Sequence, residues 1–362
     1  MKHIVFQEVI IEAYIVRRQS MNLKQLLKKW WLSLKYDPTD PRYGRGEIKI
    51  VAIGGGTGIS NLLRGLKKYS RDLTAIVAVS DAGKSSGVIR KVFKTLPPGD
   101  IRKCLAALSD DYQLLSEVFE YRFPKGSDFL SGHPLGNIWL AALIQKYNSF
   151  EKALVVSHEI LNVAGKVYPS TMAIVQLSAI FEDGKRVTGE DKIPLVGRKI
   201  KRVFFNKLGI RAYKKSIEVI KNADLIVIGP GSLYTSIIPN LLLPEISKAV
   251  RNNHSAVRIF VANCSTERGE TEEMDIPDHI RAIEIHAGKK LFDYVLVNNK
   301  ILRRSKMTSK LGEINNITSQ LNCYNNYEIV LRDLIDRRFP LYHDRDKLAK
   351  EIILLYNDIK RK

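Results

Sequence analysis

Gly54-Gly55-Gly56-Thr57-Gly58 follows the apolar run Ile48-Lys49-Ile50-Val51-Ala52-Ile53 and precedes apolar residues at helical spacing. A strand, a glycine turn and a helix start in that order form a corner where backbone N–H groups can approach a phosphate, because glycine has no Cβ. The helix start adds unpaired donors and a partial positive charge. The stretch therefore predicts a site for a nucleotide or another phosphorylated ligand. The alternative is purely structural, since a tight strand-to-helix turn also needs glycine.

The spacing of the glycines excludes the two commonest phosphate-binding motifs. A dinucleotide fingerprint needs a third glycine where Asn61 stands. The triplet Gly83-Lys84-Ser85 resembles the end of a P-loop, but Ala78 occupies the position of the required first glycine. The glycine stretch therefore predicts a phosphate site of another lineage.

The composition favours an acidic partner and a reducing compartment. The 362 residues carry a formal net charge of +20, which favours nucleotides, nucleic acid or anionic lipid. The three cysteines, Cys104, Cys264 and Cys323, form neither a disulfide framework nor a zinc motif, so a cytoplasmic location is expected. No stretch has the length and apolarity of a membrane span.

Residues 1–46 form a predicted extension that ends in a linker with two Asp-Pro pairs. Within it, apolar residues lie on one helical stripe and are surrounded by basic residues. The apolar residues of the stripe are Leu23, Leu26, Leu27, Trp30, Trp31 and Leu34. A basic amphipathic helix of this kind suits an anionic membrane surface, which predicts peripheral contact through residues 17–35. The alternative is a helix docked on its own domain or on a second subunit.

From residue 47 to residue 362, strands and helices alternate, which predicts one doubly wound, mainly parallel α/β domain of Rossmann-like architecture. The expected strands are 48–53, 73–80, 224–228, 257–262 and 294–297, and the expected helices are 101–108, 152–163, 213–221 and 277–286. A hairpin is predicted over 167–189 and a polar surface insertion over 300–330. In such sheets the ligand lies beyond the carboxyl ends of the strands.

Five further turns are rich in groups that hold phosphates and sugars. They are Asp81-Ala82-Gly83-Lys84-Ser85-Ser86-Gly87, Pro97-Pro98-Gly99-Asp100-Ile101-Arg102, Gly132-His133-Pro134-Leu135-Gly136-Asn137, Gly229-Pro230-Gly231-Ser232-Leu233-Tyr234-Thr235-Ser236 and Arg268-Gly269-Glu270-Thr271. The predicted strands place most of these turns at one edge of the sheet, which favours a functional role over a purely structural one.

Together the six motifs resemble the YvcK family of bacterial proteins, formerly called gluconeogenesis factors. The wider superfamily is named for CofD, the 2-phospho-L-lactate transferase. The resemblance runs from about residue 48 to the pair His343-Asp344. It implies a Rossmann-like, CofD-like domain that binds UDP-sugars such as UDP-N-acetylglucosamine. It also implies a role in cell shape, peptidoglycan synthesis and growth on gluconeogenic carbon.

The chain departs from the family pattern after the second predicted strand. The family usually has Asp-Asp-Gly-Gly-Ser-Ser-Gly, whereas this chain has Ala82 and Lys84 in place of the second aspartate and the second glycine. Losing a carboxylate weakens a magnesium site, because hard cations need several oxygen ligands. Asp81 is the one candidate catalytic carboxylate, and it could still hold a magnesium ion with water and substrate phosphates. No other metal site is expected.

The resemblance and the turns together give one set of candidate ligand-binding residues. They are Gly55, Gly56, Thr57, Gly58, Asp81, Ser85, Ser86, Gly99, Asp100, Arg102, His133, Asn137, Gly231, Ser232, Thr235, Asn263, Glu270 and Thr271. The usual Asn-x-Met-Thr-Gln of the family is altered here to Asn263-Cys264-Ser265-Thr266-Glu267.

Several of these residues also have structural explanations. Asp100 is favoured as a helix N-cap over a catalytic group. Arg102 is either a bidentate phosphate ligand or a surface arginine. His133 could donate to a diphosphate or be structural, and Asn137 could cap a turn or bind a ribose hydroxyl. The basic segment 198–202 is interpreted as local structure.

The sequence therefore predicts a cytoplasmic nucleotide-sugar-binding regulator that forms a homodimer. The alternative is a transferase that resembles CofD, with a divalent metal. A nucleic-acid partner is not expected, because none of the common nucleic-acid-binding signatures is apparent.

Overall fold

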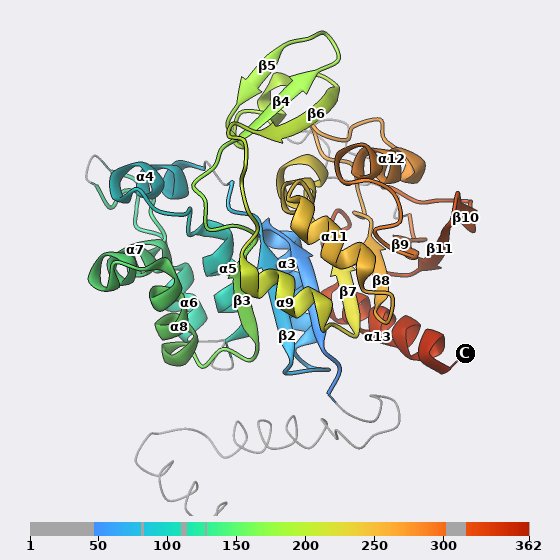
Figure 1. Cartoon of the computed structure of the whole chain (residues 1–362), viewed down its shortest axis with the longest axis horizontal. Helices are drawn as coiled ribbons and strands as arrows, with labels where there is room; N and C mark the ends of the chain where they lie inside the picture. Colours follow the sequence, from blue (N-terminus) through green and yellow to red (C-terminus); the bar gives the residue numbers. More distant parts are fainter. Residues whose placement is uncertain (1–46, 81–82, 110–113, 127–128, 302–315, 362) are drawn as a thin grey trace, which may run out of the picture. The chain divides into compact units, whose positions relative to one another are not determined.

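The computed structural model describes residues 47–80, 83–109, 114–126, 129–301 and 316–361, all of which belong to the unit Glu47–Lys362 (Figure 1). The amphipathic segment 17–35 and the candidate Asp81 lie outside the described residues.

An eight-stranded sheet forms the centre of this unit, in the order β10-β11-β9-β8-β7-β1-β2-β3. The strands are β1 (Ile50–Gly54), β2 (Leu73–Val77), β3 (Lys166–Pro169), β7 (Leu225–Ile228), β8 (Val257–Val261), β9 (Tyr294–Asn298), β10 (Cys323–Tyr324) and β11 (Tyr327–Arg332). Every neighbouring pair is parallel except β10 and β11. The predicted mainly parallel α/β sheet is confirmed.

Both faces of the sheet are covered by helices, which explains why β1, β2 and β7 are buried at every position. Ile50 and Ala52 of β1 pack in one buried cluster and Val51 and Ile53 in another, because successive side chains point to opposite faces. The first cluster includes residues of α3 (Gly56–Leu66), α5 (Gly99–Leu108) and α13 (Arg345–Arg361). The second includes residues of α9 (Lys214–Lys221), α10 (Ile238–Leu241), α11 (Pro244–Asn252) and α12 (Ile276–Ala287).

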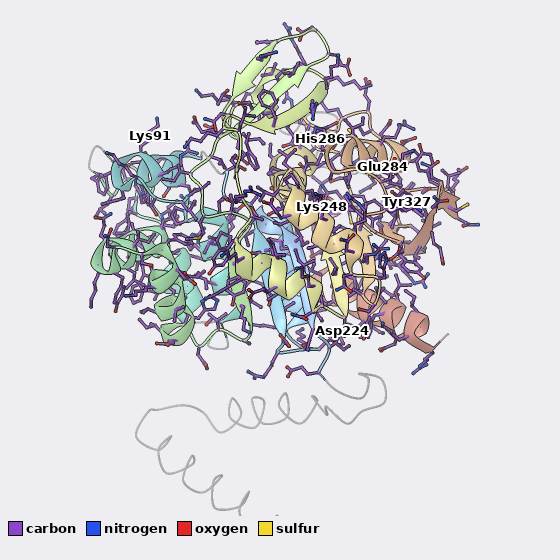
Figure 2. All side chains as sticks on the ribbon, viewed as in Figure 1. Lys91, Asp224, Lys248, Glu284, His286 and Tyr327 are labelled. Atoms are coloured by element: carbon purple, nitrogen blue, oxygen red, sulfur yellow. The ribbon has the colours of Figure 1, made fainter. Side chains whose placement is uncertain are left out.

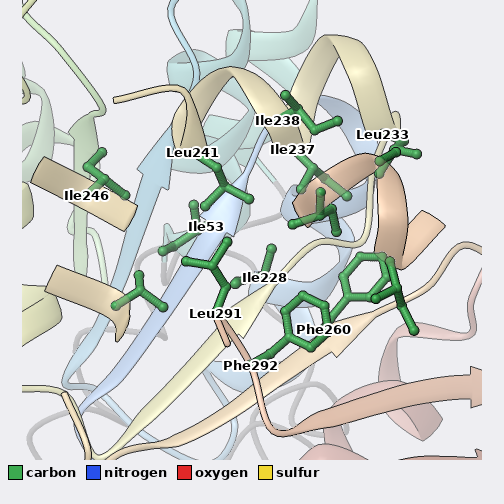
Figure 3. Close-up of a cluster of buried hydrophobic side chains, with 14 of the residues drawn as sticks. Ile53, Ile228, Leu233, Ile237, Ile238, Leu241, Ile246, Phe260, Leu291 and Phe292 are labelled. Carbon is green, nitrogen blue, oxygen red and sulfur yellow. The ribbon is translucent and has the colours of Figure 1, made fainter. Parts of the chain in front are cut away.

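Figure 3 shows part of the second cluster, beneath the turn that follows β7. Ile53, Ile228 and Phe260 rise from three neighbouring strands and meet Ile237 and Leu241 from the segment above. All five side chains are buried. This packing holds the backbone after β1 and after β7 against a rigid base.

Five helices lie between β2 and β3 in the chain, and the four besides α5 form the left side of Figure 1. They are α4 (Lys84–Phe93), α6 (Leu114–Glu120), α7 (Leu135–Tyr147) and α8 (Phe150–Ile160).

A separate three-stranded antiparallel sheet lies at the top of Figure 1, in the order β5-β4-β6. Its strands are β4 (Leu177–Phe181), β5 (Arg186–Thr188) and β6 (Ile200–Phe205), and η2 (Pro194–Val196) lies between β5 and β6. His286 of α12 accepts a hydrogen bond from the backbone N–H of Val203 at 2.9 Å and so ties this sheet to the main domain (Figure 2).

Two sequence predictions are corrected by these strands. The hairpin was predicted to begin at Val167, but Val167 pairs with Ala75 in the main sheet and the hairpin begins at Leu177. The predicted turn is present, since Lys185 N donates to Asp183 Oδ1 and Gly184 has a positive φ. The predicted surface insertion over 300–330 contains the start of β11, which joins the sheet because the buried Tyr327 and Val330 pack onto it.

The strand order creates one topological switch point. From β1 the chain proceeds outward to β2 and β3, and it then returns to β7 on the other side of β1. In doubly wound sheets the crevice at such a point, beyond the carboxyl ends of the strands, is the usual ligand site.

Candidate functional site

Two glycine loops meet at this switch point, one after β1 and one after β7. A Cβ on Gly58 would lie 2.6 Å from the carbonyl oxygen of Pro230, and a Cβ on Gly55 would lie 2.9 Å from Asp100 Oδ2. Gly56, the first residue of α3, has φ +64, which side chains rarely adopt. Glycine is therefore required here by close approach and by backbone conformation.

The loops enclose one side of a cavity of about 480 Å³. Eight of the predicted ligand-binding residues line it: Gly55, Gly56, Thr57, Gly58, Asp100, Gly231, Ser232 and Asn263. They come from four turns, which follow β1, β7 and β8 and open α5. The structure thus brings together residues up to 208 positions apart in the chain, from Gly55 to Asn263.

Asn263 joins two of these turns. Its Oδ1 accepts from Gly231 N at 3.1 Å, and its Nδ2 donates to Gly231 O at 2.9 Å. The same Nδ2 also donates to Glu267 Oε1 at 3.2 Å. These contacts fix the amide orientation of Asn263 and hold the Gly231 loop open toward the cavity.

Three other predicted residues lie behind the cavity wall. Glu270 accepts hydrogen bonds from Tyr234 N at 3.1 Å and from Thr235 Oγ1 at 2.7 Å. Thr271 Oγ1 accepts from Glu267 N at 2.9 Å. Thr235, Glu270 and Thr271 are buried, so their contacts support the backbone of the loop after β7 on the side away from the cavity.

The N-cap prediction for Asp100 is wrong. Helix α5 begins at Gly99 with Pro98 at the N-cap, and no side chain caps it. The Asp100 carboxylate instead lies beside Gly55 and pairs with Lys103 Nζ at 3.1 Å, at the cavity wall. Gly99 is buried at the helix start.

Four predicted residues form a second polar cluster, here called the Ser85 network. Arg102 Nε donates to Asn137 Oδ1 at 3.0 Å, and Asn137 Nδ2 donates to Ser85 Oγ at 2.8 Å. Ser85 Oγ lies 2.9 Å from His133 Nδ1. Arg102 also pairs with Glu120.

The amide of Asn137 sets the direction of the hydrogen bonds in the Ser85 network. Its oxygen is used by Arg102, so its nitrogen donates to Ser85, and Ser85 Oγ shares a further hydrogen bond with His133 Nδ1. Burial and the nearby charge of Arg122 lower the pKa of His133, in keeping with a neutral ring. The Arg102 side chain is 3% exposed, so the surface-arginine alternative is wrong. Ser86 is also buried.

Glu267 is a cavity-lining residue that the sequence did not single out as a ligand contact. Burial raises its pKa above the usual range of a glutamate. Burial, followed by the charge of Glu267, also raises the pKa of Glu270. The two carboxyl groups lie on one turn, in which Glu270 N donates to Glu267 O at 3.1 Å.

His343 is a second such residue, and it enters the cavity from the far end of the chain. Burial lowers its pKa to about 4, and a hydrogen bond to the Ala262 backbone opposes that shift. Because this hydrogen bond favours the protonated form of His343, the imidazole ring donates it to the Ala262 backbone. Its Nε2 is buried and has no hydrogen-bond partner among the described residues.

The remaining cavity residues have weaker sequence signals. They are Asn61, Lys103, Glu190, Pro230, Ser236, Cys264, Ser265, Thr266, Arg268, Leu341, Tyr342, Arg345 and Leu348. The residues in 263–268 directly follow the predicted strand 257–262, so this position could have identified them as candidates for the site. Glu190 and the residues of 341–348 have no local signal, because only the tertiary fold brings them to the glycine loops.

The described residues offer a poor fit to a magnesium ion. Among them, no group of three or more His, Cys, Asp or Glu side chains could hold a metal. In the cavity, Asp100 is paired with Lys103, and Glu267 accepts from Asn263.

None of the described helices has the length and apolarity needed to cross a membrane.

Comparison with known proteins gives consistent matches. The family model described as 2-phospho-L-lactate transferase CofD matches residues 50–331. The chain is 48% identical over 252 residues to the gluconeogenesis factor of Bacillus subtilis, covering 70% of this chain and 79% of that protein. It is 46% identical over 250 residues to the gluconeogenesis factor of Listeria innocua, covering 69% and 77%.

Solved structures agree with these matches. A crystal structure of a protein from Bacillus halodurans superposes with a TM-score of 0.79 at 36% identity, covering 85% of this chain and all of that chain. A second crystal structure, described as a member of the UPF0052 family from the same organism, gives a TM-score of 0.77 at 36% identity, covering 86% of this chain and all of that chain.

Proposed function

The chain belongs to the CofD family, and on this premise we propose that it is a cytoplasmic regulator that binds a nucleotide-sugar of the UDP-N-acetylglucosamine type. One observation carries the proposal. Two glycine loops, after β1 and β7, approach each other at the switch point of a doubly wound sheet and border a cavity of about 480 Å³. This size falls within the roughly 300–1,000 Å³ of small-molecule sites.

The chemistry of the cavity wall supports a phosphorylated ligand with hydroxyl groups. The N-terminus of α3 directs backbone N–H groups and a partial positive charge toward the cavity. Lys103, Arg268 and Arg345 add cationic side chains to the lining. The phosphates would therefore lie at the glycine loops.

Other side chains in the lining can accept hydrogen bonds. His343 Nε2 presents a buried lone pair, which suits a ring N–H or a hydroxyl of the ligand. A uracil and a sugar both supply such donors. The cavity thus combines phosphate-binding loops with side chains that accept hydrogen bonds, which favours a nucleotide-sugar over inorganic phosphate.

The proposed regulator acts in cell shape, peptidoglycan synthesis and gluconeogenic growth, as a homodimer. Its ligand would report the supply of an envelope precursor, and its relatives named gluconeogenesis factors agree with a link to carbon supply.

Thermal unfolding with and without UDP-N-acetylglucosamine tests the proposal. A ligand that binds only the folded state at one hundred times its dissociation constant stabilises it by about 2.7 kcal/mol. UMP and free N-acetylglucosamine serve as matched controls, and each is expected to give a smaller shift. The proposal fails if no UDP-sugar changes the melting temperature at millimolar concentration.

The family description favours one alternative, a transferase that moves a phosphoryl-linked group with a divalent metal. The test is to incubate the protein with magnesium and candidate activated donors and to look for product by mass spectrometry. Product that forms with the native chain and disappears in Asp81→Asn would replace the regulator proposal with the transferase.

A further inference from the structure

We propose that Glu267 and Glu270 form a proton-binding pair at the cavity, and that an anionic ligand binds there together with uptake of a proton by this pair. The inference rests on the proposed function, because it names a property of the same cavity. In this proposal, protonation of the pair removes the negative charge of Glu267 when an anionic ligand binds beside it.

The arrangement of the pair places one carboxyl in the wall and one behind it. Glu270 accepts from Tyr234 N and Thr235 Oγ1, one bond on each carboxylate oxygen. Glu267 lines the cavity and accepts from Asn263 Nδ2. Hydrogen bonds from Glu270 N and Thr271 N to the Glu267 carbonyl hold both residues on one tight turn.

Within the described part of the chain, no cationic side chain is ion-paired with either carboxyl group. Neither Glu267 nor Glu270 takes part in any of the ion pairs observed there. Two neighbouring carboxyl groups, one buried and one half-buried, with no cation paired to either cannot both ionise cheaply, so they titrate as a unit. Burial and mutual repulsion accordingly raise the pKa of the pair.

A ligand with a diphosphate adds negative charge in front of Glu267. This charge raises the cost of ionising the pair, so binding draws in a proton wherever the free protein has lost it. The diphosphate of a nucleotide-sugar does not itself titrate near neutral pH. The affinity should therefore fall as pH rises, by up to about tenfold per pH unit.

Other titratable and charged groups face the same cavity or pack on the pair. They are Asp100 and Lys103 from α5, Tyr234 from the turn after β7, and Glu190, Arg268, Tyr342, His343 and Arg345 from loops and the start of α13. The pKa of His343 lies near 4, so it stays neutral across the relevant range. Burial raises the pKa of Tyr234 to about 12, which keeps it protonated.

The experiment is calorimetric titration of the full chain with UDP-N-acetylglucosamine between about pH 6 and about pH 8.5, in two buffers of different ionisation enthalpy. The difference between the buffers counts the protons taken up. The wild type should take up as much as about one proton and lose affinity as pH rises. Glu267→Gln keeps the shape but removes one carboxyl group and its repulsion of Glu270, so proton uptake and the pH slope should both fall. Glu273→Gln, at an exposed position on the following turn, should behave as the wild type.

The outcomes separate this inference from the proposed function. Binding by the wild type without proton uptake, or with the same uptake in Glu267→Gln, overturns the proton-binding pair and leaves the nucleotide-sugar site intact. Absence of binding at every pH overturns both. If Glu267→Gln does not fold, Glu267→Asp, which shortens the side chain, should alter the pH slope, and an unaltered slope rejects the pair.

Discussion

Asn263 and Gly231 are joined by two hydrogen bonds, from Gly231 N to Asn263 Oδ1 at 3.1 Å and from Asn263 Nδ2 to Gly231 O at 2.9 Å. The side-chain amide thus takes the place that a neighbouring strand would take, at a point where β7 and β8 have already ended. Gly231 has φ +152, and a Cβ added to it would lie 3.3 Å from the carbonyl oxygen of Gly55. One amide therefore fixes the Gly231 loop at a point where it lies close to the Gly55 loop.

Asn263→Ala should lower the free energy of unfolding by about 1–3 kcal/mol, because it leaves the Gly231 backbone groups without partners. It should also weaken binding of UDP-N-acetylglucosamine. Urea denaturation and calorimetry measure the two effects. Asn222→Ala is the control, since Asn222 makes a single exposed bond to Glu218 O and its loss should change stability by less than about 0.5 kcal/mol. Equal effects of the two variants would contradict the proposed role of Asn263.

Gly58→Ala should destabilise the protein more than Gly56→Ala. A methyl group on Gly58 meets the Pro230 backbone at 2.6 Å, and forcing the loops apart costs about 1–3 kcal/mol. A methyl group on Gly56 meets nothing closer than 3.6 Å, so its cost is the positive φ, about 1–2 kcal/mol. Chemical denaturation ranks the two, and circular dichroism confirms the fold. Gly56→Val adds β-branching at the same φ and should abolish nucleotide-sugar binding. A stable, native Gly58→Ala would show that the loops can separate freely.

The raised pKa values of Glu267 and Glu270 predict how stability depends on pH. Below about pH 4.5, the ordinary glutamate value, both groups are protonated in the folded and unfolded chain, and their contribution is fully present. As pH rises through the raised values, the folded state must ionise a buried pair and loses that stability. Glu267→Gln should therefore gain stability relative to the wild type as pH rises from about 5 to about 8. The comparison uses the difference between the two proteins, because buried histidines titrate in the opposite sense.

Arg102→Ala should lower the free energy of unfolding by about 2 kcal/mol. It removes the guanidinium group that donates to Asn137 and pairs with Glu120 in the Ser85 network. Arg102→Lys should recover little of this, because a lysine lacks the planar fork of donors. Arg211→Ala is a matched control at an ion pair whose arginine is 88% exposed, and its effect should be close to zero. Thermal unfolding of Arg102→Ala, Arg102→Lys and Arg211→Ala compares their stabilities with that of the wild type. Full stability in Arg102→Ala would show that the Ser85 network does not contribute to the free energy of unfolding.

The segment 17–35 should bind anionic vesicles weakly, with each Lys or Arg near the surface contributing about 1 kcal/mol. Co-sedimentation compares the full chain with a chain that begins at Gly46. Loss of pelleting in the shorter chain supports the membrane contact. Equal pelleting of the two would favour a helix docked on protein.

The sequence by itself determined the sheet and its glycine corners. The apolar runs at 48–53, 73–80 and 224–228 are local patterns, and a buried parallel strand needs them whatever its neighbours are. The need for glycine at positions such as Gly56 follows from one residue's backbone conformation. The motifs were also enough to identify the CofD family.

Only the tertiary structure decided which polar residues share the cavity. From the sequence, Asp100, Thr235 and Glu270 are all candidate ligand-binding residues, yet the fold puts Asp100 in the wall and places the other two behind it. It also brings His343 to a loop that lies 285 positions earlier at Gly58. Such contacts depend on strand order and on which face of a turn packs inward, and no local pattern encodes either. The same holds for Glu267 and Glu270, whose acidity depends on burial rather than on residue type.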